Sequence, residues 1–226
     1  MPNIIRSLFL AGILAASTPS LAWAQAQPTE TAEAAYTRTI TERAGKIVEK
    51  INGLDAKKAP QVRDLIAGQY RQLNEIYEHK KTQLTALKAK PQDESTAAEK
   101  QKIEAAVTAD VAKLHKKYVS KLSKALTPEQ VDQVKDGMTY GVLPLTMRAY
   151  QEMLPTLTEA QKTQILAWLT EAREHAMDGG TSQEKHAWFG KYKGKINNYL
   201  SAAGIDMKQA GKDWAERRAA AGNASN

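Results

Sequence analysis

One segment of the chain, residues 171–200, concentrates the side chains best suited to chemistry or ligand binding. A histidine can act as a general acid or base near neutral pH, and a lysine or arginine can pair with a carboxylate or phosphate. Tryptophan and tyrosine rings offer flat surfaces on which a ligand can stack. These types together predict a shallow cleft for a sugar or another anionic ligand. The catalytic candidates are His186, Lys193, Tyr192 and Asp178, and the ligand-binding candidates are Trp188, Lys185, Lys191, Arg173 and Asn197.

The spacing in this segment places part of that set along one edge of a helix. At about 100° per residue, the apolar residues between 189 and 200 share a buried face, and His186, Lys193 and Asn197 border it. Gly190 lies beside this stripe, and a glycine inside a helix costs roughly 1 kcal/mol against alanine. Gly190 and Gly194 therefore predict close packing or the approach of a ligand. The alternative interpretation is a helix boundary whose polar groups hydrogen-bond neighbouring helices and whose lysine extends to solvent.

A lyase that acts on uronic-acid chains is one specific hypothesis for the segment. It needs a cation to neutralise the substrate carboxylate, and a tyrosine, histidine or lysine as the base. Arg173, His186, Lys191, Tyr192 and Lys193 supply these residue types. The hypothesis requires that the five side chains share one face of the fold.

Two other chemistries depend on carboxylates. Glycoside hydrolysis uses a facing pair of acids, but Glu171, Glu174 and Asp178 project opposite the apolar side of their helix, which predicts a solvated acidic face. Asp178 comes where that helix ends and can instead turn back toward His186. The spacing of Glu171, His175 and Asp178 can hold a metal, but the sequence lacks the strong zinc pattern of two histidines around a glutamate. We therefore expect no metal and no cofactor.

Lysines and two histidines lie along the two long helices that are expected before this segment. The prediction for them is a solvated surface, and the alternative is a surface that binds anionic lipid or lipopolysaccharide. The histidines are His79 and His115, and the lysines are Lys80, Lys81, Lys88, Lys113, Lys116, Lys117, Lys121 and Lys124.

The spacing of apolar residues predicts an all-α fold, a single-domain multi-helix bundle over residues 25–218. Stripes at helical spacing over 36–54, 62–87 and 103–126 predict three long helices, and shorter stripes predict four or five more. Alternating strand-like runs are missing, so no sheet is expected. Residues 219–226 are small and polar, and we expect them to form a disordered tail.

Capping signals mark where several of these helices begin. Residues 127–130, 158–161 and 181–184 each form a capping box, in which a threonine is followed three residues later by a glutamine or glutamate. Asp55 and Asp206 are expected to cap two further helices.

The first residues predict a secretory signal. Residues 1–24 contain Arg6 in a polar start, an apolar run over 8–16 and a small-residue cleavage pattern that ends at Ala24. The apolar run is shorter than the roughly 20 residues that span a bilayer, so we expect cleavage and no membrane span. The mature protein is expected to be periplasmic or secreted.

The amino-acid composition limits the kinds of chemistry and of binding partner that are expected. The chain has no cysteine, which excludes thiol chemistry and disulfides, and a formal net charge of +7, of which Arg6 carries one. A positive balance favours a glycan or another anionic ligand. Export argues against nucleic acid as the partner.

A repeated motif carries one resemblance. Leu126-Thr-Pro-Glu-Gln130 and Leu157-Thr-Glu-Ala-Gln161 share the pattern Leu-Thr-x-x-Gln. This pattern resembles the small helical periplasmic stress chaperones of the Spy and CpxP type. The resemblance implies a periplasmic chaperone-like or stress protein.

A second resemblance covers more of the chain. Blocks at 64–76 and 172–200, which include Asp64-Leu-Ile-Ala-Gly-Gln-Tyr70 and Lys185-His186-Ala-Trp188-Phe-Gly190-Lys-Tyr192, resemble domain-of-unknown-function family 3826. That resemblance implies an exported helical protein of bacteria that degrade complex polysaccharides. The leading hypothesis is therefore a protein that binds or processes polysaccharide fragments, acidic glycans included. The alternatives are the chaperone-like protein and a non-catalytic interaction module, and enzymatic activity stays open.

Overall fold

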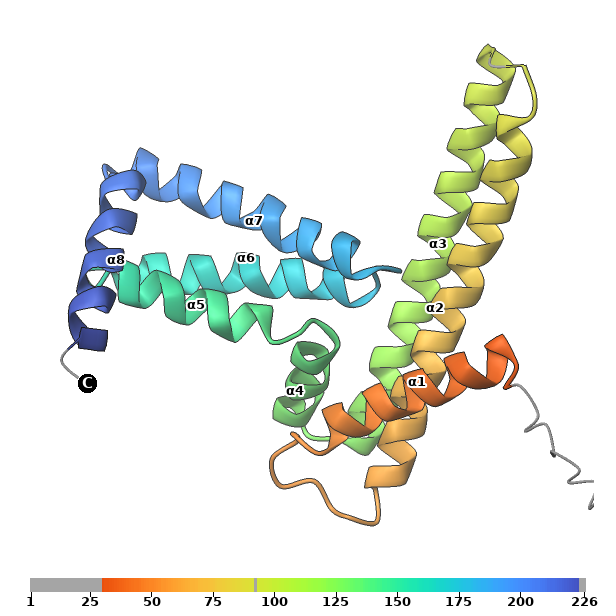
Figure 1. Cartoon of the computed structure of the whole chain (residues 1–226), viewed down its shortest axis with the longest axis horizontal. Helices are drawn as coiled ribbons and strands as arrows, with labels where there is room; N and C mark the ends of the chain where they lie inside the picture. The colour runs from red at the N-terminus through yellow and green to blue at the C-terminus, as the bar shows by residue number, and fades with distance from the viewer. Residues whose placement is uncertain (1–29, 92, 224–226) are drawn as a thin grey trace, which may run out of the picture. The chain divides into compact units, whose positions relative to one another are not determined.

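The computed structural model describes residues 30–91 and 93–223 of the chain. Every regular element in those residues is a helix, which confirms the predicted all-α fold (Figure 1). The predicted leader, residues 1–24, lies outside the described residues. The helices are α1 (Ala32–Val48), α2 (Ala59–Lys88), α3 (Glu94–Ala125), α4 (Pro128–Met138), α5 (Val142–Met153), α6 (Glu159–Met177), α7 (Ser182–Ala202) and α8 (Met207–Asn223).

Four of the helices begin where side-chain caps were predicted. Thr127, Thr158 and Thr181 each start a capping box, in which the threonine hydroxyl accepts a hydrogen bond from the backbone N–H three residues later. Each box satisfies donors that the first turn of a helix would otherwise leave unpaired. The Asp206 carboxylate likewise accepts from two backbone N–H groups in the first turn of α8. All four predicted starts are confirmed.

The start of α2 differs from the prediction. Asp55 accepts a hydrogen bond from the backbone N–H of Lys57 inside a turn, so it does not cap the helix. Helix α2 begins at Ala59 without a side-chain cap and has Pro60 in its first turn. Proline fits there because its fixed φ suits a helix start and its missing N–H would have had no partner.

Two helix lengths also differ from the prediction. Helix α1 has 17 residues and is shorter than α6 and α7, which have 19 and 21. The apolar stripe continued past the end of α1 because Ile51 is buried from the turn that follows. Helix α8 continues to Asn223, into the predicted disordered tail, since the alanines at 219–221 favour helix.

Two clusters of buried side chains hold the helices together. The first joins α1, α2, α4 and the C-terminal half of α3, and Ile66 and Leu122 lie within it. The second joins α5, α6 and α7, and contains Leu169 and Phe189. Burying one side chain of this size stabilises a fold by about 1.5–3 kcal/mol. Met177, in the last turn of α6, belongs to the first cluster, so α6 connects the two cores.

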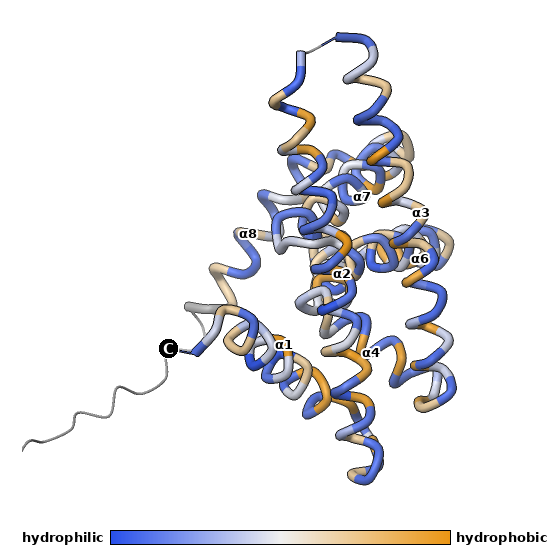
Figure 2. The backbone as a smooth tube through the Cα atoms, turned by 90° about the vertical axis from the view of Figure 1, so that its right-hand side faces the viewer, coloured by the Kyte–Doolittle hydropathy of each residue, from blue (hydrophilic) through white to orange (hydrophobic). Residues whose placement is uncertain are grey.

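Helices α2 and α3 form a long antiparallel pair (Figure 1). Near the turn that joins them the pair is mostly exposed: of the described residues between 81 and 100, only Leu87 and Thr96 are buried. Figure 2 shows hydrophobic residues recurring among hydrophilic ones along this end. Within the described part of the chain, we find no helix with both the length and the apolar character needed to cross a membrane.

The turn between α6 and α7 is fixed against α2. Asp178 is the C-cap of α6, and its backbone carbonyl accepts a hydrogen bond of 2.9 Å from the Tyr77 hydroxyl. Gly180 lies against the same ring, because a Cβ atom at this position would stand 2.7 Å from Cδ2 of Tyr77. Glycine is therefore the residue that lets the turn approach α2 this closely.

The two glycines singled out in the sequence behave differently. Gly190 and Gly194 lie on the exposed side of α7, and a methyl group at either position would meet no neighbouring atom within 4 Å. The prediction that they mark close packing is wrong, since nothing in the described structure approaches them.

These contacts predict opposite effects for two glycine-to-alanine changes. Gly180→Ala forces a methyl group into the Tyr77 ring and should lower the free energy of unfolding by about 1–3 kcal/mol. Gly190→Ala, the matched control in open space, should raise it by up to about 1 kcal/mol. Guanidinium unfolding followed by circular dichroism measures both changes. Equal effects of the two substitutions would show that the turn does not pack on Tyr77 as described.

Candidate functional site

Charged side chains from four helices meet at the C-terminal end of α6. Helix α6 supplies Glu174 and, at its C-cap, Asp178. His115 comes from α3, Lys135 from α4 and Lys185 from α7. The C-terminal end of a helix carries a partial negative charge, so cations are favourable there.

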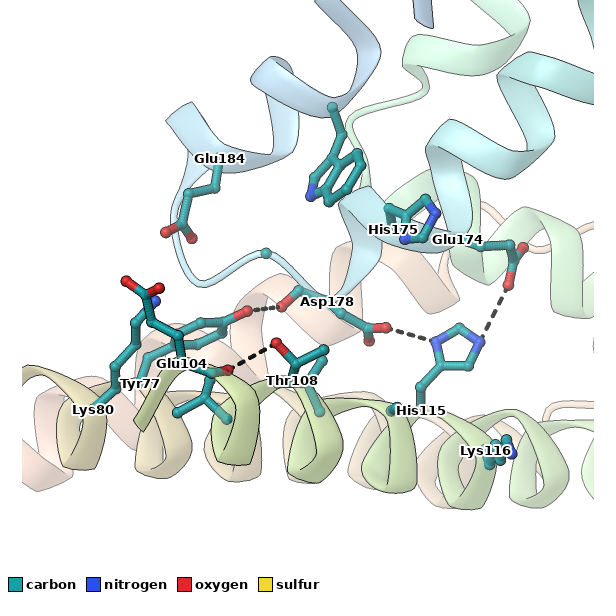
Figure 3. A pocket seen from close by; sticks show the side chains of 15 residues that line it. Tyr77, Lys80, Glu104, Thr108, His115, Lys116, Glu174, His175, Asp178 and Glu184 are labelled. Carbon is teal, nitrogen blue, oxygen red and sulfur yellow. Dashed lines mark hydrogen bonds and ion pairs between the residues drawn. The ribbon is translucent and has the colours of Figure 1, made fainter. Parts of the chain in front are cut away.

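His115 links α3 to α6 through both of its ring nitrogens. Nδ1 lies 2.7 Å from Oδ2 of Asp178, and Nε2 lies 3.4 Å from Oε2 of Glu174 (Figure 3). The hydrogen bond with Asp178, followed by the one with Glu174, raises the pKa of His115 to about 9. The ring is therefore a cation at neutral pH, and both of its N–H groups donate to carboxylates.

Glu174 is held in its ionised form. Burial alone would raise its pKa, but hydrogen bonds from His115 and Lys135 outweigh burial and lower the pKa to about 2. The Nζ atom of Lys135 lies 2.9 and 2.8 Å from the two oxygens of the Glu174 carboxylate. Glu174 therefore does not suit the role of the proton-donating acid in glycoside hydrolysis, which needs a raised pKa.

Lys185 adds a buried cation at the C-terminal end of α6. The residue is 5% exposed, and its Nζ atom donates to the carbonyl oxygens of Met138 and Met177 at 3.2 and 3.0 Å. These carbonyls belong to the last residues of α4 and α6, so one ammonium group satisfies two helix ends. Burial lowers the pKa of Lys185 to about 8.

Arg173 connects α6 to α4. Its guanidinium forms salt bridges with Asp132 and Asp136, and the distance from Nη1 to Oδ1 of Asp136 is 2.9 Å. Burial raises the pKa of Asp136, and the hydrogen bond from Arg173 works against that rise. The positive charge of Arg173 is thus neutralised by carboxylates of α4.

The ion pairs that join His115, Glu174, Asp178 and Lys135 are called the His115 array. A pocket of about 620 Å³ opens beside it, and we call this pocket the site pocket. Helices α2 and α3 contribute Tyr77 and Val107, and α6 and α7 contribute the rings of His175 and Trp188. These two rings stack with their centroids 4.3 Å apart and their planes at 16°. The site pocket combines apolar and aromatic walls with a few charged groups, a composition typical of sites for small ligands.

One oxygen of Asp178 is left over in this arrangement. Oδ2 bonds to His115, whereas Oδ1 is buried and has no hydrogen-bond partner within residues 30–91 and 93–223. Asp178 lines the site pocket and is 8% exposed. Leaving a buried acceptor unpaired costs about 1–3 kcal/mol.

Four of the predicted site residues lie at or beside the site pocket. Asp178 and Trp188 line it. The Nζ atom of Lys191 stands over the Trp188 ring, 5.0 Å from the ring centroid. Lys185 lies on the interior side, and its ammonium group donates hydrogen bonds to backbone carbonyls.

The remaining predicted residues on α7 point elsewhere. His186 is exposed and stacks on Tyr140, at a centroid distance of 5.5 Å. Tyr192 is buried in the second core. The Tyr150 hydroxyl of α5 donates to Oδ1 of Asn197 at 2.7 Å and lies 3.4 Å from the backbone carbonyl of Lys193. Asn197 thus makes a contact between helices, as the helix-boundary interpretation expected.

The structure does not assemble the residues of the lyase hypothesis. Arg173 pairs with acids of α4, Lys191 lies over Trp188, and His186 lies against Tyr140. Because these side chains occupy different faces, they cannot act together on one uronic-acid residue.

Three residues of the site were not recognised from the sequence. The expected solvated positions of His115 and Glu174 are wrong, because α3 covers this side of α6. Asp178 was expected at the site, but it turns toward His115 and not toward His186. A usable signal existed: His115 follows Val111 by four residues and precedes Tyr118 by three, which puts it at the edge of the buried stripe of α3. His175 was considered only as a metal ligand. The described residues contain no group of three or more His, Asp or Glu side chains that could hold a metal ion.

A comparison with protein families gives a match over most of the chain. A protein-family model described as "Protein of unknown function (DUF3826)" matches residues 37–220. No curated protein matches the chain.

The His115 array predicts a specific dependence of stability on pH. The pKa of His115 is raised from 6.5 to about 9 by folding. Its contribution is therefore fully present below about pH 6.5 and is lost as pH rises through about 9, a change of about 3 kcal/mol. Lys185 acts in the opposite sense, because burial lowers its pKa from 10.5 to about 8. The free energy of unfolding therefore gains a contribution from Lys185 as pH rises from about 8 to about 10.5.

A comparison of wild type with His115→Gln separates the two groups, since Lys185 is common to both proteins. The wild type should lose about 3 kcal/mol relative to the variant between pH 6.5 and 9.5 in urea unfolding. His79→Gln, a change of an exposed histidine on α2, serves as the control and should leave the wild-type profile unaltered. A constant difference between wild type and His115→Gln over this range would contradict the ionic link.

Proposed function

The chain belongs to the family described as "Protein of unknown function (DUF3826)", and from that premise we propose that it binds oligosaccharides in the site pocket. The observation that carries the proposal is the site pocket itself, in which Asp178 lies beside the stacked rings of His175 and Trp188. A sugar offers both complements, because its hydroxyls donate hydrogen bonds and its C–H faces pack on aromatic and apolar side chains.

The walls of the site pocket support this assignment. The rings of Trp188 and Tyr77 and the side chains of Val107 and Val111 give the apolar surface that a pyranose face requires. The pocket, at about 620 Å³, lies within the common size range of ligand sites, roughly 300–1,000 Å³.

The protonation states favour binding over hydrolysis. A glycosidase acid needs a raised pKa, but the pKa of Glu174 is lowered to about 2. His115 donates through both ring nitrogens to carboxylates, so it has no free nitrogen to accept a proton. We therefore propose a binding protein as the primary role.

The predicted export of the chain fits this role. A leader at residues 1–24 would deliver the protein to the periplasm or beyond, where fragments of external polysaccharides are met. We accordingly place the binding function outside the inner membrane.

The chaperone-like alternative lacks a comparable observation. A holdase for unfolded proteins needs a contiguous exposed apolar surface. Among the described residues, the exposed large apolar side chains are Tyr140, Leu145 and Leu166. The Leu-Thr-x-x-Gln motifs act as capping boxes of α4 and α6, which accounts for them without a client protein.

Oligosaccharide binding can be tested with a matched pair of tryptophan variants. Trp188 and Trp168 are both partly buried against the second core, but only Trp188 lines the site pocket. Trp188→Ala should weaken binding about tenfold or more, since loss of an apolar contact surface of this size costs roughly 1.5–3 kcal/mol. Trp168→Ala should keep the wild-type affinity.

The measurement is isothermal titration calorimetry of the purified protein against a panel of neutral and acidic oligosaccharides, with mass spectrometry of each mixture to detect products. Equal losses in both variants would mean that the indole acts only through packing. A cleaved product that disappears in Trp188→Ala would extend the role from binding to catalysis.

A further inference from the structure

Three hollows on the described surface are continuous with one another. The site pocket shares Tyr77 and Lys80 with a second hollow of about 370 Å³, and Lys80 and Glu104 with a third of about 540 Å³. The second and third hollows in turn share Leu84 and Lys88. Together these two hollows form a groove along the exposed end of α2 and α3, which we call the hairpin groove.

The carboxylates that line the hairpin groove are already engaged. Glu78 pairs with Lys81 at 3.2 Å, and Glu104 pairs with Lys100 at 3.9 Å. Asp93 is the N-cap of α3 and accepts from a backbone N–H in its first turn. The Glu184 carboxylate accepts from backbone N–H groups in the turn before α7.

Two lysines of the groove have no such engagement. Lys80 and Lys88 line it, and neither has an acidic partner within the described part of the chain. They lie two helical turns apart on α2, which corresponds to about 12 Å along the axis. Lys116, on the opposite rim of the site pocket, is also free of an acidic partner among the described residues. The four lysines and four carboxylates of the groove balance in number, so Lys80 and Lys88 are two local cations without an ion-pair partner and not part of a net positive surface.

The floor between the lysines is apolar. Leu84 and Ala97 line the third hollow, and Leu87 lies buried beneath it. A chain of sugar rings can place its C–H faces on such a floor and its charged substituents at the rim. Neutral sugars would use the floor but would gain nothing from the two lysines.

Resting on the proposed function, we infer that the ligand is an acidic oligosaccharide chain. One sugar enters the site pocket at Asp178, and the chain continues along the hairpin groove, where its carboxylate or sulfate groups pair with Lys80 and Lys88. The charge inside the site pocket does not oppose this, because His115 and Lys135 balance Glu174 and Asp178.

The test compares one sugar chain with and without its charge. The probes are an oligogalacturonide and the same oligogalacturonide with its carboxylates methyl-esterified. Calorimetry gives the affinity of each probe for the wild type, for Lys80→Gln/Lys88→Gln and for Lys102→Gln/Lys113→Gln. The last variant removes the same charge from exposed positions on α3 that line none of the three hollows.

We expect the acidic probe to bind the wild type about tenfold more tightly than the ester. Lys80→Gln/Lys88→Gln should abolish most of that preference, because it weakens binding of the acidic probe more than binding of the ester. The control variant should keep the preference. Raising the salt concentration should weaken the acidic probe selectively.

Three results would overturn the inference. Equal binding of acid and ester, with loss in Trp188→Ala, would refute the acidic preference and retain oligosaccharide binding. An equal loss in the control variant would assign the preference to net charge and not to the groove. Failure of both probes, and of sulfated and neutral oligosaccharides in the wider panel, would refute the proposed function as well.

Discussion

The negative charge at the C-terminal end of α6 is the constraint on which the surrounding helices depend. Glu174 and Asp178 lie there together with the last carbonyl groups of the helix, and burying such groups unpaired would be costly. His115, Lys135 and Lys185 neutralise them from α3, α4 and α7. Because each cation comes from a different helix, one helix end orders three neighbours. Breaking a buried pair by removing one partner costs about 3–5 kcal/mol, a large share of the roughly 5–15 kcal/mol that stabilises a domain.

The same constraint explains the chemistry that the site pocket presents. His115 uses one oxygen of Asp178, and Tyr77 uses the backbone carbonyl of that residue. The second carboxylate oxygen then faces the interior without a donor. Since the nearby cations balance the carboxylates, this oxygen acts as a hydrogen-bond acceptor in a locally neutral environment. The balanced charge around the pocket does not repel a ligand that carries negative charge elsewhere.

The features predicted correctly are those encoded within a few residues. Each capping box pairs a threonine with the residue three positions later, so its outcome is local. The contact of His115 with Asp178 joins residues 63 positions apart, and helical spacing cannot show which helix covers a given face. Glu174 does point away from the apolar side of α6, as the spacing predicted, but α3 lies over that side. The contact of Gly180 with Tyr77 was equally hidden, because the two residues lie far apart in the sequence.

The cations near the site pocket therefore fall into two groups, those that stabilise the fold and those on the surface of α2. Those at the end of α6 are committed to carboxylates and carbonyls, so changing one of them alters stability together with any ligand contact. Lys80 and Lys88 lie on the exposed pair of helices, where the core beneath consists of little more than Leu87. Substitutions there cost the fold little, since surface charges without an ion-pair partner contribute little to stability. Under the proposed function, changes along the hairpin groove would alter charge selectivity while the inner pocket keeps the sugar contacts.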